Sequence, residues 1–200
     1  EENFNGYFGT TTGVDSRNKS MKRYGISPQV SSYRWELHDE RFDYVKEPNE
    51  SNRMGWIVEI DPFDPLAPPR KRTALGRFKH ENAAQTLAKD DRVVVYMGDD
   101  QADDYIYKFV SDYRYSPDLP GLNRQLLDSG TLYVARFDGG AVAGDMMGNG
   151  QWIPLKLDTP ASEGGTLADL FDDMGALLID TRLAADAVGA TKMDRPEWVT

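Results

Sequence analysis

The stretch RVVVYMGDDQADDYIYKFV, residues 92–110, decides the fold. Two β-rich runs, Arg92–Met97 and Asp104–Val110, stand on either side of the polar connection Gly98–Asp103. Valine, isoleucine and aromatic side chains favour strands, whereas glycine and aspartate favour tight turns. Because a short turn reverses the chain between neighbouring strands, the stretch predicts the middle of an antiparallel meander.

Similar patterns continue on both sides of this stretch. Further strand-like runs are Met54–Ile60, Thr73–Phe78, Thr131–Phe137 and Gln151–Leu155, and a proline-rich connection covers Asp61–Pro69. Helical patterns are confined to Ser16–Tyr24, Ser32–Tyr44 and a longer apolar period between Thr166 and Gly189. Repeated short antiparallel strands with long loops indicate a mainly β protein, either part of a β-propeller or a sandwich.

Residue composition and hydrophobic pattern change along the chain and suggest four parts within a single segment, residues 1–200. We expect residues 1–52 to be an irregular and helical decoration, and residues 53–160 to form antiparallel β blades. Residues 161–192 are expected to be a helical insertion, and residues 193–200 a loop that enters the next strand.

Composition limits the possible partners and chemistry. The 200 residues include 23 basic and 33 acidic ones, with a net charge of −10, so binding to nucleic acid is not expected. There is no cysteine and there are two histidines, so a metal would be held mainly by oxygen. No apolar run approaches the ~18 residues of a membrane span. Because the chain opens on Glu1 without a methionine or a leader, we expect a mature or internal segment.

Carboxylates beside strand ends are the candidate functional groups, because calcium is bound by about six to eight oxygen atoms. They are Glu1, Glu2, Glu59, Asp61, Glu81, Asp99, Asp100, Asp194 and Glu197. Structural interpretations stay open: Glu59 facing water, Lys79-His80-Glu81 as a solvated strand end, and Asp99 and Asp100 as turn formers. For Asp194-Arg195-Pro196-Glu197 the alternative is an internal salt bridge.

Four blocks of the sequence resemble the PhoX family of secreted bacterial alkaline phosphatases, in the same order. They are GWIVEIDP (55–62), GRFKHE (76–81), VYMGDD (95–100) followed by YIYKFV (105–110), and MDRPEW (193–198). The opening Glu1-Glu2-Asn3-Phe4 also resembles the end of a family segment in which a cysteine precedes two glutamates. Since the family is several times longer, the resemblance implies an internal fragment of a β-propeller enzyme.

The resemblance implies a phosphomonoesterase with calcium and iron in the central channel of the propeller. Metal ligands would be Glu2 or Glu1, Glu59 and Glu81, with Asp194 and Glu197 as candidate calcium ligands. Lys79, His80 and Arg195 would face the phosphate. The cysteine that binds iron in the family lies before Glu1, so these residues alone do not complete the cluster, and the fragment alone is expected to be inactive.

Bound cations would also explain how a chain of net charge −10 attracts a phosphate dianion. The expected substrates are small phosphoesters, and the resemblance implies a periplasmic or extracellular location. Two alternatives remain: a non-catalytic calcium-binding propeller module, and a calcium-dependent propeller hydrolase such as a lactonase. Unpaired sheet edges further predict that the isolated fragment self-associates.

Overall fold

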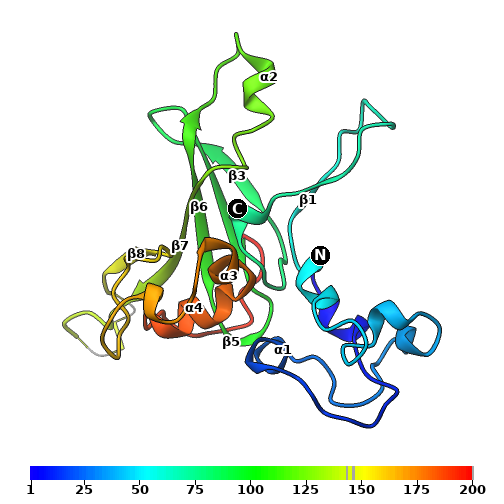
Figure 1. Cartoon of the computed structure of the whole chain (residues 1–200). Helices are drawn as coiled ribbons and strands as arrows, with labels where there is room; N and C mark the ends of the chain where they lie inside the picture. Colours follow the sequence, from blue (N-terminus) through cyan, green and yellow to red (C-terminus); the bar gives the residue numbers. More distant parts are fainter. Residues whose placement is uncertain (143, 146, 200) are drawn as a thin grey trace.

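The computed structural model describes residues 1–142, 144–145 and 147–199. Its centre is a five-stranded antiparallel sheet with the order β3-β4-β6-β7-β8 (Figure 1). These strands are β3 (Ala84–Leu87), β4 (Arg92–Gly98), β6 (Ile106–Arg114), β7 (Gly130–Phe137) and β8 (Gly150–Pro154). Neighbours in the sheet follow one another along the chain except for the short β5, so the predicted meander is confirmed.

Two small two-stranded sheets flank the central one. They pair β1 (Val58–Glu59) with β2 (Arg70–Lys71), and β5 (Ala102–Asp104) with β9 (Met193–Asp194). The second pairing matters for the site, because it brings the C-terminal residues beside the turn that follows β4.

The strand register places alternate apolar side chains on one face of the sheet. Val95 is opposite Phe109, and Phe109 is opposite Leu132, and all three are buried. This face packs against α3 (Met174–Ile179) and α4 (Thr181–Ala187), whose buried members include Leu177 and Ala184. The core therefore lies between the sheet and this helix pair.

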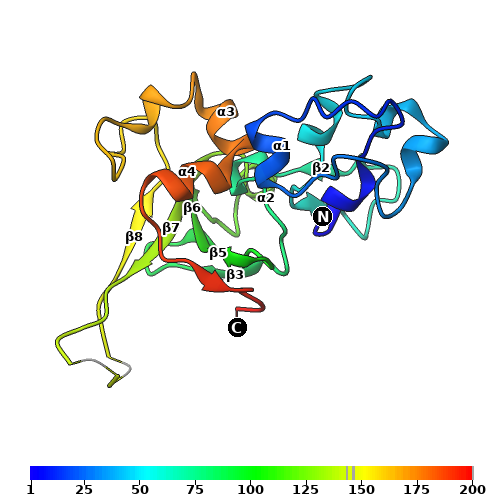
Figure 2. The same ribbon diagram turned by 90° about the horizontal axis from the view of Figure 1, so that it is seen from below.

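The N-terminal residues lie beside the sheet and have a small apolar cluster of their own (Figure 2). Its buried members are Phe8, Met21, Ile26 and Tyr44. The regular elements here are short: η1 (Phe4–Tyr7), α1 (Lys19–Arg23), η2 (Trp35–Leu37), η3 (Glu40–Phe42) and η4 (Glu50–Arg53). The helix expected within Ser16–Tyr24 is present, whereas Ser32–Tyr44 forms two 3-10 turns.

The strand predicted over Thr73–Phe78 is wrong. Thr73–Leu75 is the 3-10 helix η5, and Gly76 follows it with a positive φ of 80°. Leu75 and Phe78 are both fully buried although they are three residues apart, which an alternating strand cannot achieve on one face. Core packing therefore overrides the local β preference of this stretch.

Other boundaries differ in detail. The run Met54–Ile60 keeps two strand residues, since Gly55 turns the chain with φ 92°. The stretch with an apolar helical period after Thr166 divides into η6 (Leu167–Asp169), α3 and α4, because the backbone of Asp180 departs from helical geometry between α3 and α4.

A short helix, α2 (Pro120–Asn123), lies in the connection between β6 and β7. Thr200, the last residue of the expected 193–200 loop, lies outside the described residues.

Among the described helices, α4 is the longest with seven residues, so none of them could cross a membrane.

Candidate metal centre

Two chain segments that are distant in sequence run side by side at the end of β4. The backbone N–H of Glu81 donates to the carbonyl of Gly98 at 3.2 Å, and that of Asp100 donates to Lys79 at 3.1 Å. These two bonds place the side chains of Glu81 and Asp100 next to each other. The site is therefore built by a backbone pairing, with both residues just beyond regular strand.

Glu2 reaches the same place from the start of the chain. Its neighbour Glu1 points elsewhere, because the Glu1 carboxylate accepts hydrogen bonds from the N–H groups of Gly55 at 3.0 Å and Trp56 at 3.1 Å. Phe4, two residues after Glu2, is fully buried and anchors this end of the chain. Of the two candidate glutamates, Glu2 is the one that the structure directs to Glu81.

One carboxylate oxygen from each of Glu2, Glu81 and Asp100 lies within 4.8 Å of the others. We call these three half-buried residues the carboxylate cluster. Converging carboxylate oxygens are the donor set that hard cations prefer. The cluster thus fits the calcium and iron that the resemblance implies.

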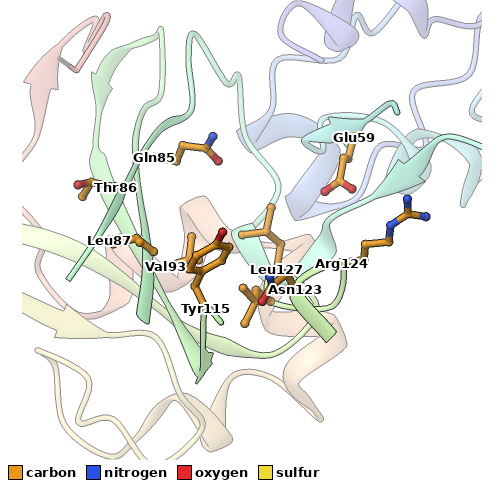
Figure 3. Close-up of a pocket in the computed structure, with 10 residues that line it drawn as sticks. Glu59, Gln85, Thr86, Leu87, Val93, Tyr115, Asn123, Arg124 and Leu127 are labelled. Atoms are coloured by element: carbon orange, nitrogen blue, oxygen red, sulfur yellow. The ribbon is translucent and has the colours of Figure 1, made fainter. Parts of the chain in front are cut away.

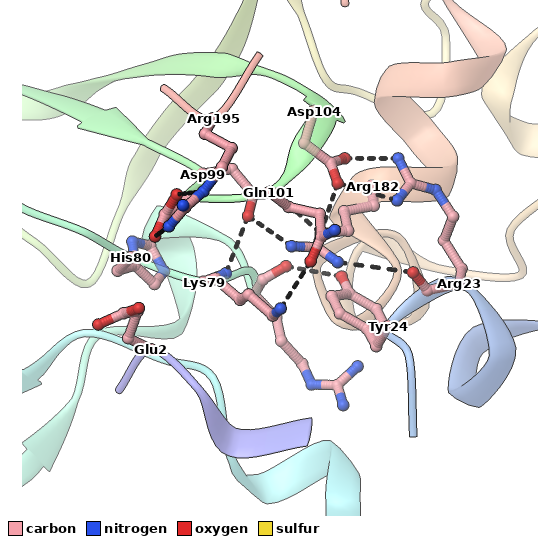
Figure 4. Close-up of polar contacts among 12 residues, drawn as sticks. Glu2, Arg23, Tyr24, Lys79, His80, Asp99, Gln101, Asp104, Arg182 and Arg195 are labelled. Carbon is pink, nitrogen blue, oxygen red and sulfur yellow. Dashed lines mark hydrogen bonds and ion pairs between the residues drawn. The ribbon is translucent and has the colours of Figure 1, made fainter. Parts of the chain in front are cut away.

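Two cationic side chains border the cluster (Figure 4). Arg195 binds Asp100 through two hydrogen bonds of 2.7 Å, and its own side chain remains 61% exposed. The Lys79 ammonium donates to the side-chain carbonyl of Gln101 at 2.6 Å. Burial and the nearby charge of Arg182 lower the pKa of Lys79. Arg195 is thus in direct contact with the cluster, and Lys79 adds a buried positive charge that interacts with Asp100.

His80 is placed differently from Lys79 and Glu81. Its ring packs on Phe78 with centroids 3.7 Å apart, and its Nε2 lies 3.0 Å from the carbonyl oxygen of Gly76. Burial lowers the pKa of His80 to about 3, so the imidazole is neutral. The structure thus buries His80 next to Glu81, and its Nδ1 has no hydrogen-bond partner among the described residues.

Glu59 does not join the cluster among the described residues. Its carboxylate forms two hydrogen bonds of 2.9 Å with the buried Arg72, which also binds Asp128 at 2.5 Å. Glu59 instead lines a cavity of about 520 Å³ with Arg124 and Leu127 (Figure 3). Its charge is thus used in an ion pair away from Glu81.

Asp194 and Glu197 lie near the cluster but outside it. Asp194 pairs with Ala102 in the β5–β9 ladder, and its side chain is exposed. The backbone of Glu197 passes directly over Gly98. From the same C-terminal stretch, the indole N–H of Trp198 donates to Glu81 at 3.0 Å. This stretch therefore closes one side of the cluster.

The sequence offered Asp100 as a candidate carboxylate but did not assign it as a metal ligand. Two adjacent aspartates after a strand and a glycine are also common in turns, so the local pattern could not separate the two roles. The two residues in fact separate: Asp100 faces the cluster, whereas Asp99 is fully buried and binds Arg182. This division depends on α4, which is more than 80 residues away along the chain.

The fold and the site define a mainly antiparallel β protein with a candidate site for a hard cation. A family model described as alkaline phosphatase PhoX matches residues 1–200, and the chain belongs to that family. No curated protein gave a match.

A solved structure is similar over nearly the whole chain. It is described as Pseudomonas fluorescens PhoX in complex with vanadate, a transition state analogue. The two sequences are 50% identical, the match covers 99% of this chain, and the TM-score is 0.87. The match confirms the predicted mainly β fold class. It covers 34% of the other protein, so this chain spans about a third of its length.

Proposed function

We propose that this chain is part of a metal-dependent phosphomonoesterase, an alkaline phosphatase that releases inorganic phosphate from small phosphoesters. The observation that carries the proposal is the carboxylate cluster, in which oxygens of three residues converge within 4.8 Å. Family membership supports it, as does the likeness to a protein that is described as binding a transition state analogue.

The carboxylate cluster would hold calcium and iron, both of which accept carboxylate oxygen. Such ions supply positive charge and a reactive oxygen nucleophile when they are bound. Glu2 and Glu81 come from separate parts of the chain, so their convergence would fix the place of a bound ion relative to the protein. Asp194 and Glu197 remain predicted calcium ligands at the border of this site.

Arg195 and Lys79 are the groups that we expect to bind the phosphate. A guanidinium matches two phosphate oxygens with parallel hydrogen bonds, and an ammonium adds a compact charge. Their charges would offset part of the negative charge of the three carboxylates, and together with bound cations they would attract a phosphate dianion to a chain of net charge −10. The resemblance also predicts His80 as a phosphate-facing group and Glu59 as a metal ligand, and both stay predictions; in the structure His80 Nε2 lies beside the Gly76 carbonyl and Glu59 pairs with Arg72.

The full-length protein tests the proposal directly. We expect it to release phosphate from p-nitrophenyl phosphate at alkaline pH, to lose activity with a chelator and to regain it with calcium. Activity that is indifferent to chelation would contradict the metal dependence. Calcium binding without turnover would favour a binding module, and turnover of lactones in place of phosphoesters would favour a lactonase. Cell fractionation tests the periplasmic or extracellular location.

Glu81→Gln is the sharpest single variant. It keeps the side-chain shape and removes the charge, so the full-length enzyme should lose metal content and several orders of magnitude in turnover. Glu163→Gln is the matched control, because Glu163 is exposed and makes no side-chain hydrogen bond with the described residues. Turnover of the Glu81 variant within about tenfold of wild type, with metal retained, would remove Glu81 from the site.

A further inference from the structure

A buried ion pair is formed by Arg182 and Asp99, the residue that precedes Asp100 of the cluster (Figure 4). Arg182 of α4 is 1% exposed and Asp99 is fully buried. The guanidinium donates to both oxygens of the carboxylate, from Nε at 2.8 Å and from Nη2 at 2.5 Å. Two ions removed from water lose hydration, so such a pair is poor evidence of a stability role by itself and calls for another explanation.

Asp99 connects this ion pair to the backbone of the site. Its Oδ1 accepts a hydrogen bond from the N–H of Lys79 at 3.2 Å, and its own N–H donates to Tyr105 at 3.1 Å. Lys79 in turn accepts from the N–H of Asp100, as described above. The Asp99 side chain thus joins the two segments that carry Glu81 and Asp100.

The opposite face of Arg182 is held as well. Its guanidinium carbon lies 5.0 Å from the ring centroid of Tyr24, and the Tyr24 hydroxyl donates to the carbonyl of Arg77 at 2.6 Å. A second buried carboxylate, Asp104, lies 3.6 Å from the Arg182 Nε. A planar guanidinium can satisfy all these contacts, whereas a lysine ammonium cannot reproduce the two parallel bonds to Asp99.

We infer that Arg182 is a positioning residue for the metal centre, acting through Asp99 to hold Lys79, Glu81 and Asp100 in register. The inference rests on the proposed function, because an effect on metal affinity requires that the carboxylate cluster binds metal. The register of the two segments is what brings the cluster oxygens together. Residues that orient metal ligands through hydrogen bonds, without contacting the metal, typically contribute about 10- to 100-fold to metal affinity. The helical insertion would thereby serve the metal site without contacting the metal.

Arg182→Lys in the full-length protein tests the inference, with calcium titration calorimetry and amide hydrogen exchange as readouts. We expect calcium affinity to fall about 10- to 100-fold, and exchange to become faster at the amides of Lys79, Glu81 and Asp100. Arg17→Lys is the matched control. Arg17 also binds a single carboxylate, that of Asp15, through two bonds of 2.8 and 2.9 Å, so the control loses the same kind of bidentate pair but should keep calcium affinity and exchange at those three amides.

Calcium affinity of Arg182→Lys within about twofold of wild type, or unchanged exchange at Lys79 and Glu81, would overturn the inference. Should this variant not fold, Asp99→Asn tests the same link, because it keeps the volume and one acceptor oxygen; wild-type affinity there would overturn it equally. Wild-type protein that binds no calcium and hydrolyses no phosphoester would contradict the proposed function, while the exchange measurement would still decide whether Arg182 positions the segment.

Discussion

Asp186 in α4 joins distant parts of the chain at a single carboxylate. It accepts hydrogen bonds from Arg23 Nε at 2.8 Å and from the Tyr105 hydroxyl at 2.6 Å. Arg23 is the last residue of α1, and it also binds the buried Asp104. Side chains from the N-terminal region, the connection between β5 and β6, and the helical insertion therefore meet at one carboxylate.

The pKa of Asp186 predicts how stability depends on pH. Burial by itself would raise this pKa, but the hydrogen bonds from Arg23 and Tyr105 outweigh burial and lower it. A carboxyl whose pKa is lowered by folding stabilises the folded state above its unfolded pKa of about 3.9, and this contribution is lost as the pH falls through the folded value. Asp186→Asn should therefore destabilise the full-length protein near neutral pH, and the difference from wild type should shrink below about pH 4.

Denaturant unfolding of both proteins between neutral and acidic pH measures this difference. Asp118→Asn is the control, because Asp118 is exposed and makes no side-chain hydrogen bond or ion pair in the described chain. A destabilisation by Asp186→Asn that stays constant down to the lowest pH would contradict the assignment.

At the scale of elements, the end of β4 and the C-terminal stretch are in very close contact. A Cβ on Gly98 would lie 2.4 Å from the carbonyl oxygen of Glu197 and 2.6 Å from that of Pro196. Both atoms belong to backbone, so a side chain could be accommodated only by moving the stretch itself. Glycine at position 98 thus lets Arg195 and Trp198 approach the cluster.

Gly98→Ala should therefore displace residues 195–198 from β4. We expect weaker pairing of Arg195 with Asp100, a higher KM for phosphoester and lower calcium affinity in the full-length enzyme. Gly121→Ala in α2 is a matched control, since a Cβ there meets no atom within 4 Å. Wild-type kinetics and calcium affinity for Gly98→Ala would show that the contact is not needed.

At the scale of the whole molecule, the 200-residue chain leaves sheet surface uncovered. Within the described residues, β3 pairs with β4 on one side alone, and Leu87 at its end is 47% exposed. Phe63 is 94% exposed and Leu66 is 91% exposed in the proline-rich connection. Unpaired strand edges and exposed apolar side chains both favour association.

We expect the isolated chain to self-associate, as sedimentation velocity would show by a concentration-dependent increase in mass. Leu87→Lys should reduce the association, because a charge on an edge strand opposes pairing with a second chain. A monomer that melts in one cooperative transition would contradict this prediction.

The sequence by itself determined the antiparallel meander of β4, β6, β7 and β8. Each of these strands carries its signal locally, as alternating or continuous β-branched and aromatic residues bounded by turn formers. The edge strand β3 was missed, because Ala84–Leu87 is short and largely exposed and so lacks an apolar period. Glu2 and Glu81 became candidates as carboxylates beside strand ends, whereas the phosphate-binding roles of Lys79 and Arg195 came from the family resemblance.

Tertiary structure alone decided which of these residues meet. Asp100 joins Glu2 and Glu81, whereas Glu59 is bound by Arg72 and His80 is buried against Phe78. The difference has a physical reason: strand formation depends on neighbours in the chain, whereas a site made of residues 2, 81 and 100 depends on contacts between distant segments. Those contacts form when the core and the buried Arg182–Asp99 pair are in place.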